Sequence, residues 1–170
     1  MKVLNIHERK LECKIEQVGT LLDSLASAED HLWPHEIWPR MSFDGPLAVG
    51  PRGGHGPIRY EIERYEPGRT IRFRFTSPRG FQGHHGYEVK QYESGVMLRQ
   101  VLEMSTSGSA LLGWPFIFRP LHDALIEDSL TKAEFAVGLE PEYHPWSPWV
   151  KFLRFVLGGK RAKSQRQLLP

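Results

Sequence analysis

Hydrophobic and polar residues alternate near the start of the chain, over residues 9–17 (RKLECKIEQ). Leu11, Cys13 and Ile15 fall on one side of an extended chain, and Lys and Glu residues fall on the other. Because successive side chains of a strand point to opposite faces, this alternation predicts a half-buried strand.

The period changes in the next segment. Leu21, Leu22 and Leu25 have the spacing of one side of a helix, and Pro34 and Pro39 then interrupt the pattern. Proline ends a helix because it lacks an amide hydrogen and clashes with the preceding turn. We therefore expect one short helix followed by a second helical turn.

From residue 41 the chain predicts a run of strands separated by turns that contain Gly and Pro. The strand segments are MSFDGPLAVG, IRYEIERYEPG, TIRFRFTSP, FQGHHGYEVKQYE and VMLRQVLEMST. Apolar residues share one face, as Ile58, Tyr60 and Ile62 do, while charged residues occupy the other face. Strands of this length, joined by tight turns, are typical of an antiparallel meander.

A long helix is predicted within residues 115–137. Its apolar residues recur at steps of three and four: Leu121, Leu125, Ile126, Leu130, Ala133 and Val137. Pro115 and Pro120 are tolerated in a first helical turn, where no amide donor is needed. The helix is expected to begin between residues 115 and 121 and to end near Gly138.

The order of these elements resembles the helix-grip fold of the START-like superfamily (SRPBCC), which includes polyketide cyclase/dehydrase-like and birch-pollen-allergen-like proteins. YEIERYEPGRTIRFRF resembles its strand–turn–strand unit, YEVKQYESGVMLRQVLEM resembles its next hairpin, and LIEDSLTKAEF resembles the end of its gripping helix. The resemblance covers residues 8–137. It implies an α+β fold, in which a curved antiparallel sheet wraps around a long C-terminal helix, with two short helices after the first strand. We expect a domain over residues 1–138 and an extension over residues 139–170.

The resemblance also implies a cavity between sheet and helix, which in this superfamily takes sterols, lipids, polyketides, hormones or other hydrophobic molecules. The candidate lining residues are Trp33, Trp38, Phe43, Tyr60, Ile62, Phe73, Phe75, His85, Tyr87, Leu98, Gln100, Leu102, Met104, Leu121, Leu125 and Ser129. For the apolar members, ordinary core packing is the competing interpretation.

Two adjacent histidines in GFQGHHGYEV are candidates for chemistry. Neighbouring residues of a strand face opposite ways, so taking Tyr87 and Val89 as inward also turns His85 inward and His84 outward. His85, with Tyr87, is therefore the candidate catalytic pair, and a buried histidine that only satisfies a hydrogen bond is the alternative. His122, beside Asp123, is interpreted as a surface or capping residue. No histidine has a recognised metal-ligand spacing, and we expect neither a metal nor a cofactor.

The extension contains YHPWSPWVKFLRFVL, which predicts an amphipathic helix over residues 146–157. Its apolar arc is wide enough to require a partner surface, and Ser147, Lys151 and Arg154 form a narrow polar strip. Three partners are open: the domain itself, a second subunit in a homodimer, or a membrane contacted through Trp146, Trp149, Phe152 and Phe155. The basic tail after this helix is expected to be disordered.

Composition narrows the class of protein. A chain of 170 residues, with 40% hydrophobic and 25% charged residues, suits one soluble domain. No apolar run reaches the roughly 20 residues of a membrane span, and no secretory signal is visible at the start, which favours a cytoplasmic protein, with peripheral membrane association as the alternative. The net charge is +2, and Glu residues interleave with the arginines of the strands, which argues against nucleic-acid binding. Cys13 is the single cysteine, so no internal disulfide forms.

Three functions are therefore open. The first is a protein that binds or carries a small hydrophobic or aromatic molecule. The second is a cyclase/dehydratase-type enzyme that uses His85 in the same cavity. The third is a membrane-peripheral lipid or quinone carrier that uses residues 146–157.

Overall fold

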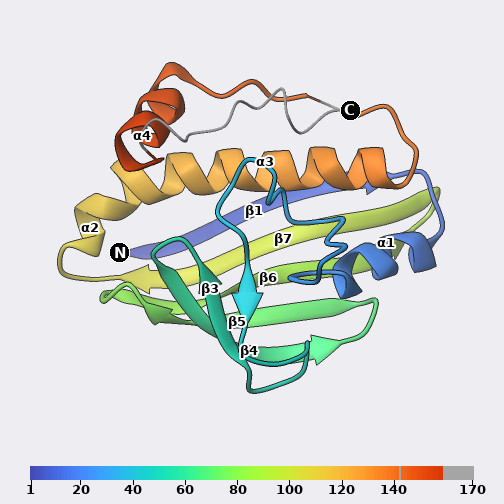
Figure 1. Ribbon diagram of the computed structural model, residues 1–170, viewed down its shortest axis with the longest axis horizontal. Coiled ribbons are helices and arrows are strands. Elements are labelled where there is room, and N and C mark those ends of the chain that lie inside the picture. The colour runs from blue at the N-terminus through green and yellow to red at the C-terminus, as the bar shows by residue number, and fades with distance from the viewer. Residues whose placement is uncertain (142, 159–170) are drawn as a thin grey trace.

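The computed structural model describes residues 1–141 and 143–158 (Figure 1). Seven strands form one antiparallel sheet in the order β1-β7-β6-β5-β4-β3-β2. The strands are β1 (Lys2–Leu11), β2 (Ser42–Phe43), β3 (Arg52–His55), β4 (Ile58–Glu66), β5 (Thr70–Ser77), β6 (Phe81–Tyr92) and β7 (Gly95–Thr106). The sheet curves beneath one long helix, which lies across its concave face (Figure 1).

The helices are α1 (Ile15–Asp23), α2 (Ala110–Gly113), the π-helical turn η1 (Trp114–Phe118), α3 (Arg119–Ala136) and α4 (Pro148–Gly158). α2, η1 and α3 follow one another without a break, and α4 packs on the side of α3 that faces away from the sheet (Figure 1). The start of α3 at Arg119 and its end before Gly138, which has a φ of +81°, confirm the predicted long helix. The α+β helix-grip architecture is also confirmed.

The predicted alternation in the central strands is confirmed. Ile58, Tyr60 and Ile62 of β4 are buried, and the residues between them are more exposed. On the outer face, Arg72 forms an ion pair with Glu63 across the β4–β5 pair, at 2.9 Å. One face of the sheet therefore packs under α3, and the other carries paired charges.

The prediction of a first strand over residues 9–17 is wrong in its bounds. β1 spans Lys2–Leu11, and α1 already begins at Ile15. The reason is pairing, because β1 runs beside β7 from Lys2 opposite Ser105 to Leu11 opposite Val96. Residues 15–22 also carry a helical spacing, with Ile15, Val18 and Leu22 three and four residues apart, and this spacing prevails over the alternation. α1 is the one helix between β1 and β2, and the second helical turn is a single turn in which the amide of Trp38 donates to the carbonyl of Pro34 at 2.9 Å.

The sequence did not predict β3. Its residues, RGGH, show no apolar alternation. Gly53 pairs with Phe43 of β2. A Cβ atom on residue 53 would lie 2.6 Å from the Phe43 ring, so the pairing of β2 with β3 needs a glycine at this position.

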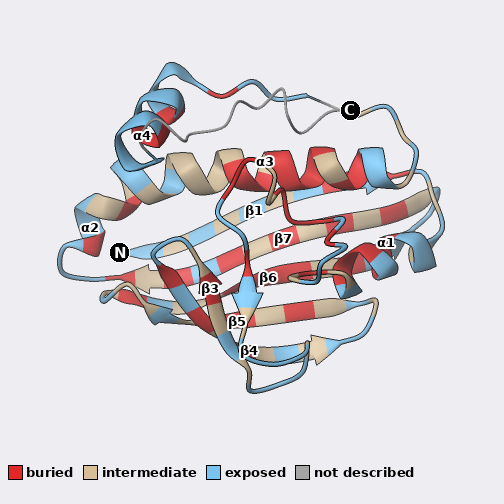
Figure 2. Cartoon of the chain, in the orientation of Figure 1, coloured by how far each residue is buried: buried red, intermediate tan, exposed pale blue. Residues whose placement is uncertain are grey.

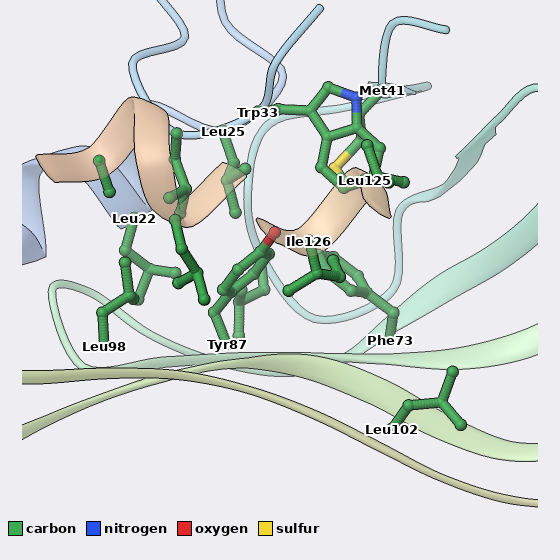
Figure 3. Packing of buried hydrophobic residues seen from close by; sticks show 14 of the residues in the cluster. Leu22, Leu25, Trp33, Met41, Phe73, Tyr87, Leu98, Leu102, Leu125 and Ile126 are labelled. Carbon is green, nitrogen blue, oxygen red and sulfur yellow. The ribbon is translucent and has the colours of Figure 1, made fainter. Parts of the chain in front are cut away.

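The space between sheet and α3 is occupied by side chains over much of its length. Buried residues cover the sheet face under α3 and the sheet-facing side of α3 (Figure 2). In Figure 3, Tyr87 rises from the sheet toward α3, with Leu22, Leu25 and Leu98 on one side and Phe73 and Ile126 on the other. This part of the interior is a solid core.

The described part of the C-terminal extension packs back on the domain. The indole nitrogens of Trp38 and Trp146 both donate to Asp128 Oδ2, at 2.7 and 2.8 Å. The guanidinium of Arg154 lies over both rings, 4.1 Å from the centre of Trp38 and 4.2 Å from that of Trp146, and donates to the carbonyl of Ile37. Arg154 was predicted on a polar strip, and the structure corrects this, because its charge is held between two aromatic faces.

The prediction that Trp146 contacts a membrane is wrong for that residue. Trp146 is buried, and it precedes α4 rather than lying within it. None of the helices in residues 1–141 and 143–158 has the length and apolar character needed to cross a bilayer. The division at residue 138 stays a prediction, and the tail predicted to be disordered lies, from residue 159 on, outside the described residues.

Candidate functional site

The inner face of the sheet carries an aromatic wall around one histidine. The ring of His85 on β6 lies 4.9 Å from that of Tyr60, 5.1 Å from that of Phe73 and 4.7 Å from that of Phe75. Phe43 of β2 closes the wall by stacking on Phe73 at 5.6 Å. The prediction that His85 faces inward is confirmed, because its side chain is buried and His84 points to the outer face, 3.9 Å from Glu103.

His85 is a neutral imidazole with an unused polar atom. Its Nε2 is buried and has no hydrogen-bond partner among the described residues. Burial holds the pKa of His85 well below its usual range, and the nearby His55, His122 and His84 add to this effect. An unpaired polar atom in an apolar site costs free energy, and such atoms in native proteins usually have a functional explanation.

A second unused polar atom lies close to His85. Gln100 on β7 is fully buried, and its Oε1 has no partner among the described residues. Gln100 stands opposite Tyr87, and His85 stands opposite Leu102, so His85 and Gln100 occupy diagonal positions on the same face of the β6–β7 pair. Diagonal side chains on one sheet face are near enough for one small molecule to contact both.

His122 completes this polar group from the helix. Its Nε2 lies 3.4 Å from Gln100 Nε2, and its ring lies 5.9 Å from that of Trp114. Burial lowers the pKa of His122, against the opposing effect of Asp123. The interpretation of His122 as a surface or capping residue is therefore wrong, because α3 turns this side chain toward the sheet.

A row of ion pairs joins β1 to α3 beside this group. His7 Nδ1 lies 2.6 Å from Glu127 Oε1, and His7 Nε2 lies 3.2 Å from Asp123 Oδ1. Arg9 continues the row, since it donates to Glu127 at 2.8 Å and to Glu134 at 2.9 Å. Burial lowers the pKa of His7, but its bonds to Asp123 and Glu127 outweigh burial and raise it to about 9.

His7, His122 and Asp123 have the composition of a cation site, because they offer ligand atoms within 4.8 Å of one another. In the structure both ring nitrogens of His7 are bonded to carboxylates, to Glu127 at 2.6 Å and to Asp123 at 3.2 Å. The ion-pair row therefore accounts for the cluster as a link between sheet and helix. The expected absence of a metal and of a cofactor stays a prediction.

This row of ion pairs was not predicted from the sequence, because the predicted first strand began at residue 9 and left out Asn5 and His7. With β1 at its true position, Asn5, His7 and Arg9 alternate on the face toward α3, while Leu4 and Ile6 face solvent. This polar-inward pattern is the reverse of the usual one, so an alternation of apolar residues could not have found it.

The surface of the described residues is hollowed at two places, among others. One, of about 450 Å³, lies at β2 and β3 and is lined by His55 and Tyr60 together with Arg40, Arg52 and Arg59. His55 Nδ1 lies 3.0 Å from the Tyr60 hydroxyl, and burial lowers the pKa of His55 to about 3. The other, of about 670 Å³, lies at the start of α1 and the β6–β7 turn, where Lys14 and Ser94 line it, and none of the buried histidines is among its lining residues.

The predicted lining residues fall into three groups. The inner wall brings together Phe43, Tyr60, Phe73, Phe75, His85, Gln100, Leu102 and Met104. The solid core holds Trp33, Ile62, Tyr87, Leu98, Leu125 and Ser129. Leu121 is partly buried at the edge of the core, and Trp38 lies outside the space, because it packs on Trp146 and α4.

Tyr87 and Ser129 are engaged with each other. Their hydroxyl oxygens lie 2.9 Å apart, and Ser129 donates to the carbonyl of Leu32 at 2.9 Å. Burial raises the pKa of Tyr87 well above its usual range. Tyr87 therefore has the geometry of an anchor between sheet and helix, and its catalytic role stays a prediction.

Comparison with known proteins supports the fold. No family model and no curated protein matches the chain. Among solved structures, a protein from Thermobifida fusca is similar with a TM-score of 0.60 and 14% identity, over 84% of this chain and 97% of that one. CalU16 from Micromonospora echinospora is similar with a TM-score of 0.57 and 14% identity, over 93% and 92%.

The di-domain ARO/CYC StfQ from the steffimycin biosynthetic pathway is also similar, with a TM-score of 0.58 and 15% identity over 80% of this chain. This chain spans only half of the length of StfQ, as one domain of a di-domain protein would. The chain thus has the same fold as these structures, the helix-grip fold that the sequence predicted. Likeness at these identities shows the fold and not the function.

Proposed function

We propose that the protein binds a small hydrophobic or aromatic molecule between the sheet and α3, and that His85 and Gln100 hold one polar group of that molecule. The observation that carries the proposal is a pair of buried polar atoms beside an aromatic wall, His85 Nε2 and Gln100 Oε1, for which residues 1–141 and 143–158 supply no partner. A ligand hydroxyl group both donates and accepts, so it suits an amide oxygen and an imidazole nitrogen at once.

The ligand reaches this site by displacing partly buried side chains. Phe75 stacks on His85 with an interplanar angle of 23°, and it is itself only partly buried. Phe118 of η1 and Leu121 of α3 are also partly buried, on the facing side of the interior. A rotation of Phe75 lets an aromatic ligand take its place against His85, so that ring stacking is exchanged rather than lost.

Titration calorimetry with 2-naphthol, a neutral aromatic hydroxyl compound, tests the proposal. Replacement His85→Phe keeps a ring of similar size and removes the hydrogen bond, which is expected to weaken binding roughly tenfold. The matched control is His84→Phe on the outer face of the same strand, which is expected to leave the affinity unchanged. Equal affinities in the two variants would contradict the proposal, and so would a wild-type protein that does not bind the probe.

A cyclase/dehydratase-type enzyme is the second candidate. The observation that favours it is the neutral imidazole of His85, which lies beside the phenol of Tyr60 in an apolar site where it can act as a base. The discriminating variant is His85→Gln, which keeps a polar side chain but cannot carry a proton between groups. An extracted ligand that the wild-type protein converts, and that this variant binds without converting, would support the enzyme. Cytoplasmic location and a homodimer stay predictions of the sequence.

A further inference from the structure

One corner of the molecule exposes large apolar side chains from two helical segments. Leu112 is 71% exposed and Phe116 is 60% exposed on α2 and η1. Phe152 is 52% exposed and Phe155 is 65% exposed on α4, beside the partly exposed Trp149. We call these five residues the aromatic patch. Exposed apolar side chains gathered in this way mark an interaction surface.

The two segments form one surface. The indole nitrogen of Trp149 donates to the carbonyl of Phe116 at 2.8 Å, and the ring of Trp149 stacks on that of Phe152 at 5.3 Å. α4 buries one side of itself, through Val150, Leu153 and Arg154, and the opposite side of the helix is exposed (Figure 2). The patch is therefore held in place by the fold, with its aromatic face toward solvent.

The two stretches of sequence that carry the patch are basic. The sequence contains no Asp or Glu between residues 104 and 122, and none from residue 143 to the end. The same two stretches contain Arg119 and Lys151, together with Arg154, whose guanidinium is buried between Trp38 and Trp146. Lys160, Arg161, Lys163 and Arg166 follow α4 in the sequence, outside the described residues. Arg119 and Lys151 are exposed next to the patch, and Arg119 also forms an ion pair with Asp123, one turn further along α3, at 3.6 Å. A second copy of the chain, related by a two-fold axis, would bring like charges together, whereas an anionic lipid surface is complementary to them.

We propose that the aromatic patch docks on the surface of a bilayer that contains anionic lipids. Aromatic side chains enter the boundary between headgroups and acyl chains, and flanking basic residues bind the headgroups. Such binding needs no membrane-spanning helix. It also does not depend on ligand binding in the interior, so the two proposals can fail separately.

If the interior binds a ligand as proposed above, docking also determines where that ligand enters. η1 contributes to both the patch and the interior. Phe116 belongs to the patch, while Trp114 is buried against Phe81 and His122. A docked protein therefore brings the end of the interior that Trp114 covers next to the lipid phase, where hydrophobic molecules accumulate.

Co-sedimentation of the full chain with vesicles tests the docking. Vesicles of phosphatidylcholine alone are compared with vesicles that also contain phosphatidylserine. We expect binding to the mixed vesicles, at least about tenfold weaker binding to phosphatidylcholine alone, and weakening by salt, which screens the headgroup charges. The double variant Phe152→Gln, Phe155→Gln is expected to bind the mixed vesicles at least roughly tenfold more weakly, because two aromatic side chains that docking would bury in the bilayer are lost.

The matched control is the double variant Leu4→Thr, Ile6→Thr. It removes two exposed apolar residues from the outer face of β1, where Glu103 and Glu8 are close by, and we expect it to bind like the wild type. Both variants are first checked for an unchanged melting temperature and an unchanged 2-naphthol affinity, so that folding and the interior site are accounted for.

Four results would overturn the docking proposal: no binding to mixed vesicles, equal binding to both kinds of vesicle, equal loss in both double variants, or no loss in the patch variant. Light scattering tests whether a second copy of the chain, rather than a bilayer, covers the patch. A wild-type dimer that becomes a monomer in the patch variant, without vesicle binding, would assign the patch to a second copy of the chain.

Discussion

The phenol of Tyr87 on β6 donates to the hydroxyl of Ser129 on α3 across 2.9 Å, since Ser129 directs its own hydrogen to the carbonyl of Leu32. This bond ties the sheet, the long helix and the segment after α1 at one point. It also uses the hydrogen-bonding capacity of the hydroxyl group that the sequence put forward for catalysis.

Replacement Tyr87→Phe is therefore expected to lower the free energy of unfolding by about 1 to 2 kcal/mol, because one buried hydrogen bond is lost. Urea denaturation measures the loss. The affinity for 2-naphthol is expected to remain within about twofold, since the bond lies in the solid core rather than at His85. A variant that keeps its stability and loses the probe would place the phenol in the binding site.

Replacement His85→Phe is expected to stabilise the protein while it weakens binding. The imidazole Nε2 is buried without a partner among the described residues, and an apolar ring of the same shape removes that penalty. A gain of about 1 kcal/mol would raise the melting temperature by roughly 2–4 °C. Thermal melts of this variant and of His84→Phe compare the two faces of β6. A melting temperature that falls in His85→Phe alone would show that the imidazole nitrogen has a partner.

Stability is expected to be greatest near pH 6.5 and to fall on both sides. The pKa of His7 is about 9 in the folded protein and 6.5 when unfolded, so its ion pairs stabilise fully below pH 6.5. This contribution, of about 3 kcal/mol at most, is lost as the pH rises through 9. His55 and His85 act in the opposite direction, because burial lowers their pKa values, and stability falls as the pH drops below 6.5.

Urea denaturation at a series of pH values gives this profile. The variant His7→Gln is expected to lose the decline between pH 6.5 and 9 and to keep the decline on the acid side. A wild-type protein whose stability is flat over the alkaline interval would exclude the raised pKa of His7.

Replacement Phe75→Ala is expected to speed the association of 2-naphthol, because Phe75 is the partly buried ring that stacks on His85. Stopped-flow measurement gives the rate, and we expect an increase of about tenfold, as for a site that no longer waits for a side chain to move. The control is Phe73→Leu in the buried wall, which is expected to lower stability without a faster association. An unchanged rate in Phe75→Ala would place the access route elsewhere.

The sequence predicted the parts of the fold that depend on local periodicity. Ile58, Tyr60 and Ile62 alternate in β4 as expected, and α3 begins and ends where its apolar spacing and Gly138 indicate. The prediction failed where pairing with a distant strand determines the bounds of an element. β1 is the example, because its pairing with β7 extends the strand back to Lys2.

Of the candidate site, the sequence predicted the part that lies on β6 and missed the parts that lie on α3 and β1. The parity of β6 placed His85 inward correctly, but His122 was assigned to the surface, and the inward polar face of β1 was not seen. Ion pairs such as that between His7 and Glu127 join residues 120 positions apart, and no local pattern reports such a contact. The position of Trp38 was missed for the same reason, since the C-terminal extension that covers it folds back over α3.

Native mass spectrometry of the protein purified from its own host tests most directly whether the interior holds a guest. We predict a complex heavier than the chain by one small hydrophobic or aromatic molecule, which solvent extraction releases and which is depleted in the His85→Phe protein purified in the same way. A wild-type protein with the mass of the chain alone, which also leaves added 2-naphthol unbound, would contradict the account.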